Sequence, residues 1–284
     1  MKNLILKPIP GRPALLLAGK ERRLLCIADL HLGIETTFIE RGINVTPQSE
    51  WLAENILSIA EKVNATELLI VGDLKHNIPI NTVLEAIHIP EFLNALASNL
   101  KVTVIPGNHD TGLKKIIPGN IHLERSTGMI VNLEGVKVGF VHGHSKPCAQ
   151  IFNTDILITA HTHPAIRLID RLYKTFIEPV WVTTKLITAN LKNLVDDLLL
   201  QDNIVNTKTI IMPAFNPLIT GSPVNTGKNN PFLGPLQKPQ FIDVKNAEIH
   251  MLDGTYLGTL KDLPEFNDFK FNFSLKNTAR ISDF

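Results

Sequence analysis

Apolar residues follow two spacings along the chain, and the first two thirds alternate between them. Short apolar runs bounded by polar or turn residues are typical of strands, and they occur at 14–17, 22–28, 67–71, 101–105, 127–133, 136–141 and 155–159. Between 47 and 63 the apolar residues recur at helical spacing, which predicts a helix with one buried face. The residues of that face are Leu52, Ile56, Ile59, Ala60 and Val63. This alternation predicts a mixed α/β fold.

Turn and capping residues set the expected boundaries of these elements. Thr46 followed by Pro47 predicts an N-cap with proline at the first helical position. Gly19 predicts the turn of a first hairpin, and Glu134-Gly135 predicts the turn of a second one. Pro90 predicts an interruption of the helical sequence that precedes the strand at 101–105, because proline has no N–H to donate to the helix ladder.

The last third of the chain has a different pattern. Its expected elements are a helix over 185–201, a strand over 208–212, and a strand pair at 247–252 and 255–260 around Gly254. Residues 220–240 are dense in Gly, Pro, Asn and Lys without any period, which predicts a long loop.

Composition limits the class of protein. The chain has 284 residues, of which 44% are hydrophobic, and a net charge of +1, which together exclude a disordered chain. Only Cys26 and Cys148 are present, which excludes a disulfide scaffold. No apolar run is long enough for a membrane span, and the first apolar run is too short and too broken by Pro and Gly for a signal peptide. We therefore expect a soluble, cytoplasmic protein with no membrane contact.

The length fits one large domain or two modest ones, at roughly 100–200 residues per domain. No clean linker divides the chain, so we expect one domain over 1–284. Within it, 24–164 carry the polar motifs described next, 165–262 complete the core, and 263–284 form a tail.

Five apolar runs end in polar residues of the kind that bind metals. These residues are Asp29 and His31, Asp73 with His76 beyond it, Asn108 with His109 and Asp110, His142 with His144, and His161 with His163. Residues i and i+2 of a strand face the same side, and α/β sheets place ligand sites at the carboxyl ends of strands. Carboxylate, imidazole and amide ligands without thiolate favour Mn²⁺, Fe or Zn²⁺. Because the carboxylate of Asp73 has two oxygens that can bridge a pair of ions, a two-metal centre is expected.

These five blocks, in this order, resemble the calcineurin-like metallophosphoesterase superfamily, whose pattern is D-x-H, G-D, G-N-H-D/E, a lone His and G-H-x-H. Ala160 stands where the family usually has glycine in the last block, which is the only departure. The resemblance implies a four-layer αββα sandwich of two mixed β-sheets flanked by helices, with a dimetal site at the carboxyl ends of the strands.

The resemblance also implies a role for each matching residue. One metal would be bound by Asp29, His31 and His163, the other by Asn108, His142 and His161, with Asp73 bridging both. His109 would lie beside the substrate phosphate, and Asp110 would orient it. Two divalent ions are implied, with manganese favoured and iron, zinc or nickel as alternatives. A metal-activated hydroxide would then hydrolyse a phosphodiester bond.

The segments 178–181, 213–218, 221–225 and 252–258 resemble a narrower group, the phosphoesterases related to the SbcD nuclease, which includes the ligase-associated DNA-repair phosphoesterase. This implies a phosphodiester substrate, with DNA or RNA as candidates and a role in DNA repair. The near-zero net charge weighs against a nuclease, since proteins that bind nucleic-acid backbones usually have a basic face.

Two alternatives stay open. One is a small-molecule phosphodiesterase or phosphatase that acts on nucleotides or cyclic nucleotides. The other is a non-catalytic scaffold of the same fold, although the intact set of seven ligand positions argues against it.

Two histidines and the tail have no single interpretation. His76 and His144 are either substrate contacts or parts of the local structure. The tail alternates Phe269, Phe271 and Phe273 with polar residues, which predicts either an edge strand packed on the core or a surface for a protein partner or a homodimer.

Overall fold

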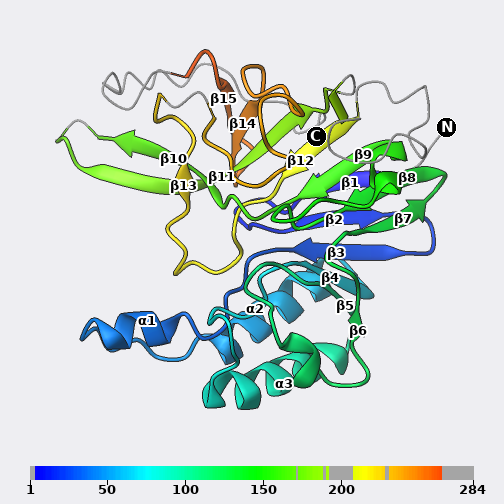
Figure 1. The fold of residues 1–284 in the computed structure, drawn as a ribbon, viewed down its shortest axis with the longest axis vertical. Helices are drawn as coiled ribbons and strands as arrows, with labels where there is room; N and C mark the ends of the chain where they lie inside the picture. Colours follow the sequence, from blue (N-terminus) through cyan, green and yellow to red (C-terminus); the bar gives the residue numbers. More distant parts are fainter. Residues whose placement is uncertain (1–3, 171, 188–189, 192–206, 228–229, 264–284) are drawn as a thin grey trace.

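Two β-sheets packed face to face form the centre of the molecule (Figure 1). The computed structural model describes residues 4–170, 172–187, 190–191, 207–227 and 230–263. The first sheet has the strand order β1-β2-β3-β4-β5-β6. Its strands are β1 (Ile5–Pro8), β2 (Leu15–Ala18), β3 (Arg23–Ile27), β4 (Glu67–Val71), β5 (Lys101–Ile105) and β6 (His122–Leu123). Strands β3 to β6 pair in parallel, and β1 to β3 pair antiparallel.

The second sheet has the order β13-β10-β11-β12-β9-β8-β7, and β14 and β15 extend it from β11. Its strands are β7 (Met129–Leu133), β8 (Val136–Phe140), β9 (Ile156–Thr159), β10 (Pro164–Ile169), β11 (Thr175–Lys185), β12 (Lys208–Ile211), β13 (Ser222–Pro223), β14 (Glu248–Met251) and β15 (Tyr256–Thr259). Here too β8, β9 and β12 are parallel while the other neighbours are mostly antiparallel. The predicted pair of mixed sheets is therefore confirmed.

Helices cover the outer face of the first sheet. In the part of the chain that the structure describes, the α-helices are α1 (Glu35–Glu40), α2 (Ser49–Lys62) and α3 (Val83–Ala97), and they are followed by the short 3₁₀ helices η1 (Leu113–Lys115) and η2 (Ala149–Asn153). The apolar faces of α2 and α3 bury Leu52, Ile56, Ile89 and Phe92 in one cluster with residues of the first sheet. Helix α3 begins with a capping box, in which Thr82 and Glu85 satisfy each other's backbone N–H groups.

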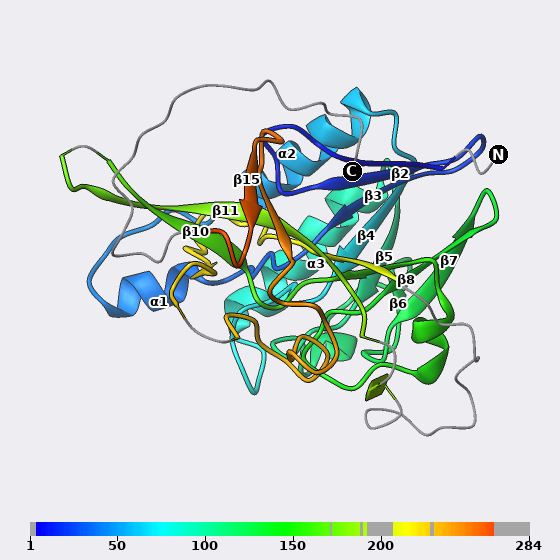
Figure 2. The ribbon, with the colours of Figure 1, turned by 90° about the horizontal axis from the view of Figure 1, so that it is seen from above.

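A second apolar cluster lies between the sheets, and a third covers the outer face of the second sheet. The cluster between the sheets includes Cys26, Phe140 and the fully buried Trp181. On the outer face of the second sheet, in the described residues, the helical layer is represented by η2, and the segment 232–247 packs beside it. Both views show α1 and the β10–β11 hairpin projecting from the same side of the molecule (Figure 1, Figure 2).

Most elements match the expectation from the pattern of apolar residues. The two hairpins, the strands β4 and β5 and the strand pair around Gly254 are confirmed, and β4 and β5 prove to be parallel neighbours. The turn of the second hairpin lies at Glu134 and Gly135 as predicted, and both residues have positive φ. The long loop expected over 220–240 contains, in its described residues, only the two-residue β13.

Two predicted boundaries are wrong. Thr46 does not cap α2, because that helix begins at Ser49 and the backbone N–H of Gln48 donates instead to Glu35 Oε1 at 2.6 Å. Pro90 does not interrupt α3, which continues to Ala97. Burial of Ile89 on one side of the proline and of Phe92 on the other offsets the one missing hydrogen bond.

Several expectations concern residues outside the described part of the chain. A helix was predicted over 185–201, but its first residue, Lys185, is the last residue of β11. Most of the remaining range, 188–189 and 192–201, lies outside the described residues. The phenylalanine-rich tail is also outside them. One domain over 1–284 stays a prediction, and the pairing of β14 with β11 is what supports it. Among the described helices, none combines the length and the apolar character that crossing a bilayer requires.

Replacing the buried Trp181 with alanine should lower the free energy of unfolding by about 3–5 kcal/mol, because it leaves a cavity between the sheets. The measurement is guanidinium denaturation followed by far-UV circular dichroism. Trp51, the other tryptophan, is 45% exposed on α2, so Trp51→Ala should cost well under half as much. Equal losses in the two variants would contradict the assignment of the inter-sheet core.

Candidate metal centre

The polar residues of the motifs gather where strands of both sheets end. Asp29 follows β3, Asp73 follows β4 and Asn108 follows β5, all in the first sheet, whereas His142 follows β8 and His161 follows β9 in the second. The two sets meet, since His142 Nε2 lies 3.3 Å from Asp73 Oδ2. The strand ends therefore build one site from both sheets, as expected for the carboxyl ends of parallel strands.

The pairs at i and i+2 converge for a different reason from the one expected. Asp29, His31, Asp73, His161 and His163 all lie beyond the ends of their strands and have positive φ, between 44° and 72°. Non-glycine residues rarely adopt this left-handed conformation, and such residues cluster at functional sites. Turns after the strands, and not strand alternation, thus aim these side chains into the site.

The side chains form two groups that share one carboxylate. Asp29, His31, Asp73 and His163 make the first group, and Asp73, His142 and His161 make the second; in each, the potential ligand atoms lie within 4.8 Å of one another. In the first group, His163 Nε2 is 3.2 Å from Asp29 Oδ1 and 3.4 Å from His31 Nε2. Both groups could each hold one metal ion.

Each carboxylate uses one oxygen for the backbone and presents the other to the imidazole rings. Asp73 Oδ1 accepts from the N–H of His109 at 2.9 Å, and Asp29 Oδ2 accepts from the N–H of His161 at 3.3 Å. Asp73 Oδ2 faces both groups, 3.5 Å from His31 Nε2 and 3.3 Å from His142 Nε2. One oxygen of Asp73, rather than the two expected, is therefore in position to be shared.

Burial and the two carboxylates set the protonation of the rings. Burial lowers the pKa of His31 to about 3 and that of His161 to about 4. Burial acts in the same direction on His142, but its close contact with Asp73 and the charges of both aspartates raise its pKa to about 9. In turn, the pKa of Asp73 is lowered, because the contact with His142 and the charge of that ring outweigh the burial of the Asp73 carboxylate. Without a metal, the proton favoured on His142 offsets part of the carboxylate charge, whereas the rings of His31 and His161 stay neutral.

The donor atoms fit divalent cations. Asp29 Oδ1, Asn108 Oδ1 and His142 Nε2 are buried and have no hydrogen-bond partner. Buried polar atoms normally have partners, so three orphans among the residues of the five motifs need an explanation. Ligands of an ion at about 2.1 Å are spaced by about 3 Å from one another, close to the separations between these groups. A pair of cations would complete the coordination of these atoms, in place of the protons.

Two glycines permit this close approach. A Cβ atom on Gly107 would lie 2.1 Å from Asp73 Oδ1, and one on Gly72 would lie 2.1 Å from His142 Nδ1. Real side chains do not tolerate contacts this short, so both positions must lack one. These glycines belong to the G-D and G-N-H-D blocks, and the need for space was not evident from the sequence.

His109 lies beside the first group, but Asp110 does not orient it as expected. His109 Nδ1 donates to the carbonyl oxygen of His76 at 2.5 Å, and its ring centroid is 4.7 Å from that of His31. The Asp110 carboxylate instead accepts from the backbone N–H of Leu74, Lys75 and Gly107. Asp110 fixes the two loops that follow β4 and β5, and the carbonyl of residue 76 fixes the ring of His109.

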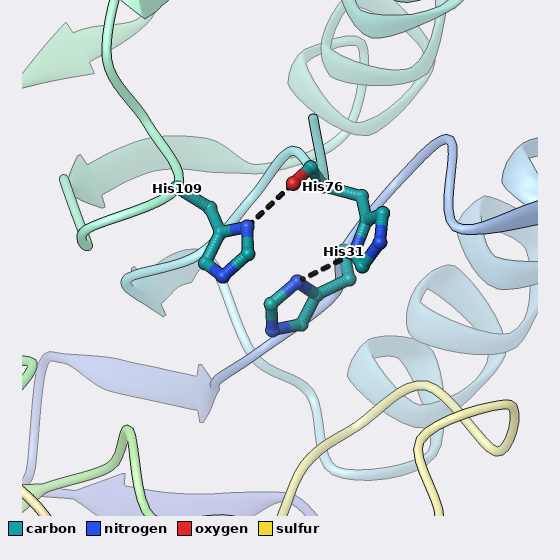
Figure 3. Close-up of side chains that lie close together, drawn as sticks. All are labelled: His31, His76 and His109. Atoms are coloured by element: carbon teal, nitrogen blue, oxygen red, sulfur yellow. Dashed lines mark hydrogen bonds between the residues drawn. The ribbon is translucent and has the colours of Figure 1, made fainter. Parts of the chain in front are cut away.

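The two histidines of open interpretation both lie near the site. His76 Nδ1 is 3.2 Å from His31 Nδ1, and Figure 3 shows His31, His76 and His109 grouped around this contact. The ring of His144 lies 5.3 Å from that of His142 and 6.2 Å from that of His161. Burial lowers the pKa of both His76 and His144, so the neutral ring is favoured at each position.

Part of the long loop packs against the site, and sequence reasoning missed the residues involved. Gln237 is fully buried, and its amide bonds to Thr162 Oγ1 and to the carbonyl of Ala160, which flank His161. A Cβ atom on Gly234 would lie 2.2 Å from the carbonyl oxygen of Gly143 and 3.3 Å from the ring of His161. No motif or period marks Gln237 or Gly234, so nothing in the sequence could have singled them out.

Comparison with known proteins identifies a family for most of the chain. The family model described as calcineurin-like phosphoesterase matches residues 22–231. Among solved structures, Pseudomonas putida nuclease MPE is 16% identical, with 88% of this chain and 98% of that chain covered at a TM-score of 0.47. Yfce, a phosphoesterase from E. coli, is 17% identical, with 83% and 96% covered at a TM-score of 0.35. At these identities and TM-scores, neither structural likeness decides fold or function.

Gly107→Ala should abolish tight binding of divalent metal, because the new methyl group displaces the carboxylate of Asp73. Isothermal titration with Mn²⁺ measures this. Gly119 provides the matched control, because a Cβ atom there would meet no other atom within 4 Å, so Gly119→Ala should bind Mn²⁺ as the unaltered protein does. Unchanged Mn²⁺ binding by Gly107→Ala would show that Asp73 does not belong to the metal centre.

Proposed function

The chain belongs to the calcineurin-like phosphoesterase family, and from that premise we propose that this hydrolase cleaves phosphodiester bonds with a pair of divalent ions. The observation that carries the proposal is the overlap of two groups of ligand atoms at one carboxylate, that of Asp73. Two-metal hydrolases hold their ions about 3.5–4 Å apart, a separation that a shared carboxylate oxygen can bridge.

Each group of side chains is assigned to one ion. We assign Asp29, His31 and His163 to the first ion and Asn108, His142 and His161 to the second, with Asp73 shared. Manganese is the ion that this oxygen- and imidazole-rich set favours, and iron, zinc and nickel are the alternatives. The orphaned oxygen of Asn108 supports its place in the second set.

The reaction needs charge neutralisation, a nucleophile and a proton for the leaving oxygen. Bound divalent ions supply the first and make water acidic enough to act as the second. His109 supplies the proton for the leaving oxygen. Because its Nδ1 donates to the carbonyl of His76, its Nε2 is the nitrogen free to face a phosphate. Asp110 contributes by fixing the loop that carries His109, through its bond to the N–H of Gly107 at 2.7 Å.

The substrate class is proposed to be a phosphodiester of nucleic acid, in the context of DNA repair. The motifs shared with the SbcD-related phosphoesterases support this. The net charge of +1 favours the second candidate, a small nucleotide or cyclic-nucleotide diester, since it supplies little attraction for a polyanion. The complete set of convergent ligand side chains speaks against a non-catalytic scaffold. A cytoplasmic location and a partner or homodimer at the tail stay predictions from the sequence.

His109→Ala should keep both metal ions and lose most turnover, by a factor of about 10²–10⁴, the range expected for loss of a positioned acid. Hydrolysis of a dinucleotide phosphodiester measures turnover, because its alkoxide leaving group needs the proton that His109 would supply, and titration with Mn²⁺ measures binding. His88, on α3 beside Glu91, provides the control, because His88→Ala removes an imidazole that lies outside the site. Loss of metal from His109→Ala would show that the role assigned to His109 is wrong.

The nucleic-acid and small-diester candidates differ in what the Mn²⁺-loaded protein cleaves. We expect hydrolysis of bis-p-nitrophenyl phosphate together with nicking of labelled single- or double-stranded DNA, both abolished by chelation. Cleavage of the small diester with no nicking of DNA or RNA would favour the second candidate. Failure to bind two equivalents of Mn²⁺ would refute the two-metal proposal itself.

A further inference from the structure

We propose that His76 is a positioning residue, which holds the ring of His31 in the orientation and tautomer that metal binding needs, and that it does not contact substrate. The inference rests on the proposed function, since that function makes His31 a metal ligand. Its evidence is a chain of side-chain contacts that runs from the site to α1.

The chain of contacts has three members. His31 Nε2 points into the first group, 3.5 Å from Asp73 Oδ2, while its Nδ1 lies 3.2 Å from His76 Nδ1 (Figure 3). On the far side of its ring, His76 Nε2 lies 3.2 Å from Thr37 Oγ1, on α1. Both nitrogens of His76 thus have partners within the protein.

The hydrogens on the rings of His31 and His76 have only one arrangement that lets His31 bind a metal. An ion at His31 Nε2 requires a lone pair there, so the hydrogen of the neutral ring sits on Nδ1. That N–H can donate only if His76 Nδ1 carries a lone pair, which places the His76 hydrogen on Nε2, where it donates to Thr37. The reverse arrangement puts a hydrogen on His31 Nε2 and blocks the metal. Metal-binding histidines commonly depend on such a partner at the second nitrogen.

The backbone holds His76 firmly enough for this role. The N–H of His76 donates to the carbonyl of Leu32 at 3.0 Å and faces Glu85 Oε1 at 3.3 Å. The next residue, Asn77, donates to the same Glu85 oxygen from its backbone N–H at 2.9 Å and from its side chain at 3.1 Å. The ring of His76 is therefore placed from its own loop, from α1 and from the start of α3.

If His76 contacted a third ion or the substrate, one of its contacts with His31 and Thr37 would have to be lost. His31, His76 and His109 lie close enough to hold an ion. However, Nδ1 of His31 and Nδ1 of His76 face each other, Nε2 of His76 faces Thr37, and Nδ1 of His109 bonds to a carbonyl. The nitrogens of His76 are used within the protein, which favours positioning over either alternative.

The test is calorimetric titration of the full chain with Mn²⁺. His76→Ala should weaken one of the two Mn²⁺ equivalents by about 10–100-fold, the usual effect of losing the partner of a ligating histidine, and leave the other unchanged. Thr37→Val should have a smaller effect in the same direction. His122, which is exposed and pairs with Glu124 away from the site, gives the control variant His122→Ala, expected to match the unaltered protein.

Two amide substitutions separate positioning from a general structural role. The oxygen of asparagine at position 76 can reach the place of Nδ1, whereas the amide of glutamine reaches only the place of Nε2. His76→Asn should therefore restore most of the Mn²⁺ affinity, and His76→Gln should not. If His76→Ala fails to fold, the difference in Mn²⁺ affinity between His76→Asn and His76→Gln tests the proposal instead.

The proposal is overturned in favour of a substrate contact if His76→Ala binds Mn²⁺ with wild-type affinity but has a raised KM for bis-p-nitrophenyl phosphate. A third Mn²⁺ equivalent that disappears in His76→Ala would overturn it in favour of a third metal site. If the unaltered protein binds two Mn²⁺ but hydrolyses no diester, the proposed function fails while the positioning role stands. If the unaltered protein binds no Mn²⁺, both fail, and this is seen before any variant is made.

Discussion

The burial of two carboxylates side by side is the constraint on which the rest of the structure depends. Asp29 and Asp73 are at most 1% exposed, at the place where the strand ends of the two sheets meet. Removing such charges from water costs several kcal/mol for each ion unless positive charge and hydrogen bonds compensate. One oxygen of each carboxylate is satisfied by a backbone N–H, and the other faces imidazole rings. Either protons on His142 and His163 or a pair of cations can neutralise that second oxygen. The first case is the metal-free site, and the second is the metal-bound site.

The same constraint explains the unusual backbone around the carboxylates. For a buried aspartate and its neighbouring histidine to face the same point, the chain must turn immediately after the strand, and five site residues do so at positive φ. Each of these conformations costs of the order of 1 kcal/mol or more, so surrounding contacts must stabilise it. Gly72 and Gly107 provide the space. Asp110 and Gln237 provide hydrogen bonds to the loops, the first after β4 and β5 and the second beside His161.

The sequence was a good guide to the sheets and to which residues meet, and a poor guide to how they meet. Apolar runs such as 67–71 identify strands because burial on both faces leaves a continuous signal, and β4 has those bounds. The partner of a side chain leaves no such signal. The resemblance assigned Asp110 to His109, but a carboxylate can satisfy backbone N–H groups just as well, and here it does. Thr46 is a good cap by type, yet Glu35, 13 positions from Gln48, takes that N–H through a tertiary contact. Thr37 and Gln237 act through contacts that only the folded chain creates.

Helix α3 connects this site to the hydrophobic core. Glu85 caps the start of α3, and the same carboxylate accepts from the backbone of Asn77, one residue beyond the carbonyl that holds His109. One turn later the helix packs Ile89, and two turns later Phe92, against the first sheet. The position of the loop at His76 therefore depends on how α3 packs, although no residue of α3 faces the ligand groups. Glutamate suits this position better than glutamine would, because every group around its oxygens is a donor, and an amide NH₂ would leave one of them without an acceptor. Packing in the core and orientation of the rings are thus linked by one buried acceptor.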